Sequence, residues 1–186
     1  MKNLMFIALC LTLSILFTAC SGDDKLTTNA IANSKEIEMK ANNKEITPTV
    51  IMKKLKETDY GDMDSFQSIM GNPDSNVPYV KIGETISVKF NDQESAPDSY
   101  ELVDYVLSEE GTMKYKQSDI TKMNIDFDNE TASFVLTENV LTYASSDSKD
   151  YESGAVLRGM RLLCKWKDTT QEMAFVIRTD ATQNEG

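Results

Sequence analysis

Histidine is absent from the 186-residue chain, and its absence excludes several kinds of chemistry. Ser–His–Asp and Cys–His arrangements, in which histidine activates the nucleophile, are impossible. Zinc needs histidine or clustered cysteine, and the three cysteines, Cys10, Cys20 and Cys164, form no such cluster. Carboxylate pairs of the glycosidase type can always be drawn from 30 acidic residues, so their presence indicates little. We therefore expect a protein that is not an enzyme and that uses no cofactor.

Basic residues are scarce as well. Lysine and arginine together number 19 against 30 acidic residues, which gives a formal net charge of −11. Phosphate groups would be repelled by this charge, so the composition argues against binding of nucleic acid or of an anionic bilayer surface through charge.

Long apolar runs are lacking except at the N-terminus. Residues 4–17 are mostly apolar and directly follow Met1-Lys2-Asn3. The run is shorter than the roughly 20 residues that a membrane-spanning helix needs, and a positive residue before a short apolar run is typical of a secretory signal. A buried core helix is the alternative, but the run is apolar on every face.

The apolar run ends in Phe17-Thr18-Ala19-Cys20, which resembles the lipobox of bacterial lipoproteins. The resemblance implies that residues 1–19 are a lipoprotein signal peptide and that Cys20 carries the lipid. It also implies a location in the bacterial cell envelope, anchored to a membrane and facing the extracytoplasmic side. Cys10 would leave with the signal peptide, so Cys164 would have no partner for a disulfide.

The next segment, residues 20–48, is rich in Ser, Thr, Asn, Asp, Lys and Glu. It contains few large apolar residues to bury, so we expect a lipidated, disordered tether.

Residues 49–76 are harder to interpret. They predict either a short helix over residues 50–56 or an extended edge segment, followed by a break at residues 71–74 (GNPD).

From residue 77 to residue 181 the apolar residues recur with a period of two, which predicts β-strands with one buried face. The pattern is clear in residues 84–90 (ETISVKF), 121–127 (TKMNIDF), 131–137 (TASFVLT) and 158–166 (RGMRLLCKW). Turn residues at 128–130 and 167–170 predict hairpins. We expect an all-β fold, an immunoglobulin-like antiparallel β-sandwich of about seven strands. Cys164 and Trp166 fall on the apolar face and are predicted core residues.

Two acidic stretches offer oxygen ligands for calcium. One contains Asp59, Asp62 and Asp64, and the other contains Asp126 and Asp128. Neither matches the twelve-residue EF-hand loop, so we expect solvated turns rather than a metal site.

Two tyrosines are the best placed for ligand recognition. Tyr143 and Tyr151 bracket a polar loop, and tyrosine is an efficient contact residue in loop-based binding. The leading hypothesis is therefore a lipid-anchored extracytoplasmic binding module for a glycan, a peptide or an envelope protein. A structural or accessory subunit of an envelope assembly is the alternative, and a carboxylate-dependent hydrolase comes third.

Overall fold

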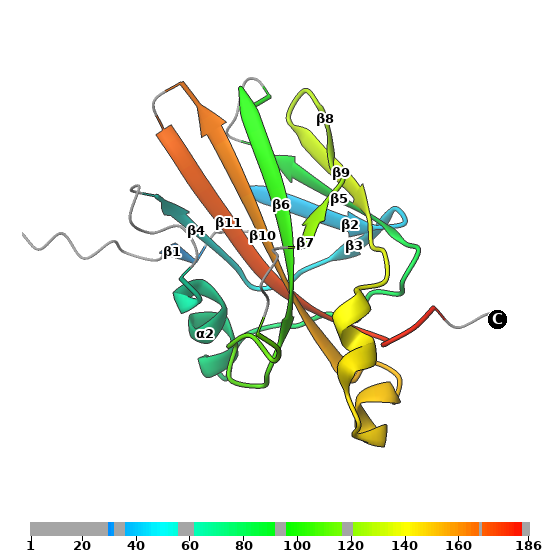
Figure 1. The fold of residues 1–186 in the computed structure, drawn as a ribbon. Helices are drawn as coiled ribbons and strands as arrows, with labels where there is room; N and C mark the ends of the chain where they lie inside the picture. The colour runs from blue at the N-terminus through cyan, green and yellow to red at the C-terminus, as the bar shows by residue number, and fades with distance from the viewer. Residues whose placement is uncertain are drawn as a thin grey trace, which may run out of the picture.

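The computed structural model describes residues 30–31, 36–55, 62–91, 96–116, 121–167 and 169–183. Within them lie eleven strands, one α-helix and two 3-10 helices (Figure 1). The strands are β1 (Ala30–Ile31), β2 (Ile37–Ala41), β3 (Lys44–Ile46), β4 (Val50–Lys54), β5 (Thr85–Phe90), β6 (Ser99–Leu107), β7 (Thr121–Met123), β8 (Asp126–Asp128), β9 (Thr131–Val135), β10 (Val156–Trp166) and β11 (Thr169–Thr179). The helices are α2 (Asp64–Gly71), η2 (Val140–Ala144) and η3 (Ser148–Tyr151).

The strands form two antiparallel sheets that pack face to face. The first sheet has the order β1-β4-β11-β10-β6-β7, and the second has the order β3-β2-β5-β9-β8. The predicted all-β sandwich is therefore confirmed, with more strands than the expected seven or so. Its likeness to an immunoglobulin domain is one of architecture, two antiparallel sheets around a shared core.

The predicted apolar faces meet between the sheets. Met160, Leu162 and Cys164 of β10 are buried in this core, and Trp166 packs against it. Ala132 and Phe134 of β9 face them from the second sheet. The predicted core positions of Cys164 and Trp166 are thus confirmed. The apolar alternation in this stretch marks the face of β10 that is turned toward the second sheet.

Helix α2 covers the outer face of the first sheet, as Figure 1 shows. Phe66 and Ile69 of the helix are buried against Tyr105 and Leu107 of β6 and Leu157 of β10. The Phe66 and Tyr105 rings meet edge to face at 5.6 Å. The central strands β10 and β11 are consequently buried on both faces, which is why their sequences do not alternate as cleanly as β5 and β9.

The predicted tether and the predicted domain boundary at residue 77 both need correction. Strands β2 and β3 lie in the second sheet, within the stretch assigned to the tether. Ile37, Met39 and Ala41 alternate with polar residues, and all three are buried. Residues 50–54 are extended rather than helical, because β4 pairs with β1 and β11 in the first sheet. The sandwich therefore includes residues well before 77.

Residues 121–127 were expected to form one strand but form parts of two. β7 is the edge of the first sheet and β8 is the edge of the second, so the chain crosses between sheets at residues 124–125.

The predicted turns are confirmed. Asn129 and Lys167 adopt positive φ angles of 53° and 50° in the β8–β9 and β10–β11 connections.

A buried ion pair lies on the inner face of the first sheet. Arg158 donates from Nε to Asp104 Oδ1 at 2.7 Å and from Nη2 to Asp104 Oδ2 at 2.5 Å. Asn139 donates to the same carboxylate at 2.6 Å, and Arg158 Nη1 donates to the Thr137 carbonyl at 3.1 Å. This network joins β6 and β10 to the segment that leads into η2.

Asp104→Ala should destabilise the fold strongly, because it leaves the Arg158 guanidinium buried without its counterion. We expect a loss of about 3–5 kcal/mol in the free energy of unfolding, measured by urea denaturation. The matched control is Glu101→Ala, which removes the exposed ion pair with Lys122. That change should have an effect of about 1 kcal/mol or less. Similar losses in the two variants would contradict the role given to Asp104.

Candidate functional site

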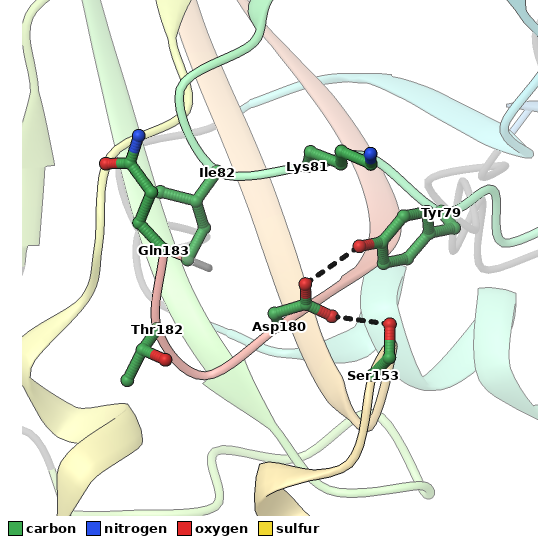
Figure 2. A pocket seen from close by; sticks show the side chains of 7 residues that line it. All are labelled: Tyr79, Lys81, Ile82, Ser153, Asp180, Thr182 and Gln183. Carbon is green, nitrogen blue, oxygen red and sulfur yellow. Dashed lines mark hydrogen bonds between the residues drawn. The ribbon is translucent and has the colours of Figure 1, made fainter. Parts of the chain in front are cut away.

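Two adjoining hollows open at one end of the sandwich, and Tyr79 and Lys81 line both of them. The first hollow, of about 290 Å³, lies between the segment around Tyr79 and the end of β11, and is drawn in Figure 2. The second, of about 370 Å³, lies between the same segment and edge strand β3. Both are near the lower end of the range of about 300–1,000 Å³ that is usual for ligand pockets.

The Asp180 carboxylate links the segments of the chain that line the first hollow. It accepts hydrogen bonds from the Tyr79 hydroxyl at 2.9 Å, the Ser153 hydroxyl at 3.0 Å and the Gly154 N–H at 2.8 Å. Figure 2 shows Tyr79 and Ser153 each bonded to a different oxygen of the Asp180 carboxylate. Segments that are 27 and 101 residues away in the sequence are thereby fixed around one carboxylate.

The backbone around Tyr79 is fixed independently of its side chain. Tyr79 forms a parallel bridge with Arg178 of β11. The Val80 N–H donates to the Arg178 carbonyl, and the Arg178 N–H donates to the Pro78 carbonyl, both at 2.9 Å. The ring therefore has a defined position although 42% of the residue's surface is exposed.

The Tyr79 hydroxyl is a hydrogen-bond donor at neutral pH. Partial burial raises the pKa of Tyr79, and the neighbouring Asp180 carboxylate raises it further, which outweighs the opposing hydrogen bond with Ser153. The protonated hydroxyl points to Asp180, and 42% of the residue's surface stays exposed beside the hollow. A fixed, half-exposed aromatic ring beside a hollow is a feature of sites that stack on flat or ring-shaped ligands.

Other side chains of the first hollow keep polar groups for a ligand. Lys81 makes no side-chain ion pair within the part of the chain that the structure describes, and it lines the hollow together with Thr182 and Gln183. The main chain of Gln183 is fixed by donation to Glu138 Oε1 at 2.8 Å. An ammonium group, a hydroxyl and an amide thus line the same hollow as the Tyr79 ring.

Asn76 lines the second hollow and donates to the Thr47 carbonyl at 2.6 Å. Lysines and glutamates balance along its walls, with Lys44 and Lys81 against Glu45 and Glu84. The chain as a whole has a formal net charge of −11, whereas the lysines and glutamates that line this hollow are equal in number. It favours an uncharged polar ligand over a highly charged polymer.

Tyr143 and Tyr151 lie on η2 and η3, the yellow segment that projects from the sandwich in Figure 1. Both are half-exposed, as expected of ligand-contacting residues, but neither lines the two hollows. Tyr143 donates to Glu138 at 2.6 Å, and Tyr151 donates to the Ser145 carbonyl at 2.9 Å. Because Glu138 also holds Gln183, the projecting segment borders the first hollow without entering it.

The structure describes four of the five acidic residues that were weighed as calcium ligands. Asp59 lies outside the described residues. Asp62 pairs with Lys53 at 3.0 Å, whereas Asp64 is the first residue of α2. Asp126 and Asp128 are exposed on the same side of β8. Among residues that the structure describes, no group of three or more acidic or cysteine side chains is arranged to hold a metal ion.

Comparisons with known proteins give no further information on the site: no family model matches the chain, and neither a curated protein nor a solved structure does. Cys20, the predicted lipidation site, lies outside the described residues. The helices within the described ranges are all too short or too polar to cross a membrane.

Cys164 should be chemically inert in the folded protein. Burial raises the pKa of its thiol to about 12, so almost no thiolate is present at neutral pH. We expect the thiol to resist a disulfide reagent such as DTNB in buffer and to react fully in 6 M guanidinium, followed by absorbance at 412 nm. Rapid modification under native conditions would contradict its position in the core.

Proposed function

We propose that the protein is a lipid-anchored extracytoplasmic binding module and that its ligand is a glycan that lies across the Tyr79 ring. The observation that carries the proposal is the position of this ring, held by Asp180 and shared by two adjoining hollows. Each hollow has a volume suited to about one or two sugar units. A chain of sugars that spanned both hollows would place one ring against Tyr79.

The polar groups that line the two hollows support the same ligand class. Thr182 and Gln183 in the first hollow and Asn76 in the second offer hydroxyl and amide groups, which match the donors and acceptors of sugar hydroxyls. The balance of lysines and glutamates in the second hollow suits an uncharged chain. A rigid sandwich that presents such groups at one end is a common design for recognition.

The lipobox-like sequence that ends at Cys20 supports the anchored location. Lipid on Cys20 would attach the chain to a membrane, and the negative net charge would keep the folded part away from an anionic bilayer surface. A module held in this way presents its hollows to the space outside the cytoplasm.

An accessory subunit of an envelope assembly is the second candidate, and one observation favours it. β8 pairs with β9 only from Thr131 to Ser133, so Phe134 and Val135 have no strand on that side within the described ranges. A groove of about 380 Å³ runs there between β9 and β7. A strand from a partner protein could pair with this free edge.

The glycan proposal predicts that Tyr79→Ala weakens binding about five- to tenfold, while Tyr79→Phe, which keeps the ring and loses only the bond to Asp180, weakens it less. The ring contact is worth about 1–1.5 kcal/mol, and a factor of ten corresponds to about 1.4 kcal/mol. Binding would be found first by thermal shift with neutral oligosaccharides, because a ligand at about 100 times its Kd stabilises by roughly 2.7 kcal/mol. Affinities would then be measured by calorimetry.

Tyr143→Ala is the matched control, since this half-exposed tyrosine lies outside both hollows. Its affinity should equal that of the wild type. Loss of binding in Tyr143→Ala with full binding in Tyr79→Ala would move the site to the projecting segment. No thermal shift with any oligosaccharide, together with capture of an envelope protein that depends on the β9 edge, would favour the accessory subunit.

Anchoring gives a separate prediction. Cys20→Ala should remove the lipid and leave either an unprocessed precursor or protein released from the membrane fraction. Metabolic labelling with a clickable fatty acid, followed by fractionation, measures both effects, and Cys164→Ala serves as the control that should still be labelled. Persistent labelling of Cys20→Ala would contradict the proposed anchor.

A further inference from the structure

A cluster of charged side chains is enclosed between helix α2 and the outer face of the first sheet. Lys53 of β4 and Glu172 of β11 stand opposite each other in the strand register. Arg161 comes from β10, and Asp62 precedes the first residue of α2 by two positions. The hollows around Tyr79 share no residue with this cluster.

The distances in the cluster bring an amine next to a carboxyl group. Lys53 Nζ lies 3.0 Å from Asp62 Oδ1 and 3.2 Å from Asp62 Oδ2, so the carboxyl carbon between these oxygens is also adjacent. Lys53 Nζ is also 3.7 Å from Glu172 Oε1. The side chain of Lys53 is only 4% exposed and that of Glu172 only 1%, whereas that of Asp62 is 33% exposed.

The remaining contacts hold these groups in place. Ser65 donates to Glu172 Oε1 at 2.5 Å, and Arg161 Nε lies 3.2 Å from Glu172 Oε2 without the alignment of a hydrogen bond. Arg161 Nη2 donates to the main-chain carbonyl of Asp62 and lies 3.9 Å from its Oδ1. The Asp64 N–H donates to the same Oδ1 at 3.3 Å.

No other lysine within the described residues has such surroundings. The other lysine–carboxylate pairs are Lys40–Glu38, Lys89–Glu130, Lys114–Asp150 and Lys122–Glu101. In each of them the lysine side chain is at least a third exposed and has one carboxylate partner. Lys53 is almost fully buried and has two carboxylate partners, one of which is itself buried.

We propose that Lys53 and Asp62 form an intramolecular amide cross-link, with Glu172 as the proton carrier. Proton transfer within the Lys53–Asp62 pair gives a neutral amine and a neutral acid. After the Asp62 carboxyl rotates to present its carbon, Nζ attacks that carbon. Glu172 takes a proton from the attached nitrogen and returns it to the departing hydroxyl, which leaves as water. Two of the three ammonium hydrogens and one Asp62 oxygen are lost, and no oxidant or reductant is needed.

Two physical effects favour this reaction. The first is proximity, because groups held in contact react as if at an effective concentration of about 10⁵–10⁸ M. The second is burial, since a buried ion pair is penalised by the loss of hydration and an amide carries no charge. Arg161 contributes as a positioning residue, because its Nη2 holds the main-chain carbonyl of Asp62 and lies 3.9 Å from Oδ1, close to where negative charge develops when Nζ attacks.

The test is a tryptic digest of the purified protein analysed by mass spectrometry. Trypsin cannot cleave after Lys53 once its amine is part of an amide, so peptide 45–54 should be joined to peptide 57–81. The joined mass should be lower than the sum of the two peptides by about 18 Da, the mass of one water. Fragmentation should place the link between Lys53 and Asp62.

Two variants and one internal control sharpen the result. Lys53→Arg keeps the positive charge and should give no joined peptide, and Glu172→Gln should reduce the joined fraction at least tenfold. The exposed pair Lys114–Asp150, only 2.6 Å apart, should stay unlinked in the same digest. Wild-type protein that yields only the free peptide 45–53 would overturn the cross-link. Full linkage in Glu172→Gln would overturn the role of Glu172.

Discussion

The structure depends on one constraint: the central strands of the first sheet are out of water on both faces. The second sheet covers one face and helix α2 covers the other. Any buried charge on β10 or β11 must therefore be paired, because an unpaired buried charge is severely destabilising. Arg158 is paired with Asp104 on the inner face, and Arg161 lies beside Glu172 on the outer face. Each arginine thereby fixes the position of a neighbouring segment: the chain before η2 in one case and the start of α2 in the other.

These buried pairs act more on specificity than on net stability. Charge attraction in the interior is offset by the loss of hydration, so an apolar core of the same volume could be equally stable. A core made only of aliphatic groups would, however, accept α2 in several positions, because apolar contact is not directional. Ser65 bonds to Glu172, and Phe66 sits over Gly159, where a methyl group would come within 2.9 Å of the ring. Polar bonds set the position of the helix along the sheet, and the missing side chain at Gly159 sets how closely it approaches.

The sequence predicts best the elements whose position is set by local alternation. Residues 84–90 and 131–137 alternate because one face of β5 and β9 lies in the core, and the β8–β9 turn contains Asn129, a residue type that accepts positive φ. β2 and β3 escaped prediction because average composition hides the alternation of Ile37, Met39 and Ala41 among polar residues. The chain crosses between the sheets at residues 124–125 without interrupting the apolar–polar alternation. In the sequence β7 and β8 therefore look like one continuous strand. The helix over Phe66 and Ile69 covers a face that no pattern within a single strand reveals.

The candidate site is out of reach of sequence analysis for a related reason. Tyr79 and Asp180 are 101 residues apart, and their contact exists only because the segment around Tyr79 pairs with the end of β11. Tyr143 and Tyr151 stood out because they flank a polar loop, but loop position does not determine which tyrosine borders a hollow. The same pairing means that the site is assembled only in the folded sandwich. Asp180 at the end of β11, Ser153 before β10 and Tyr79 ahead of β5 must all be in place before the ring is held. A ligand that contacts this arrangement therefore binds the folded state alone, and its binding energy adds to the stability of the whole sandwich.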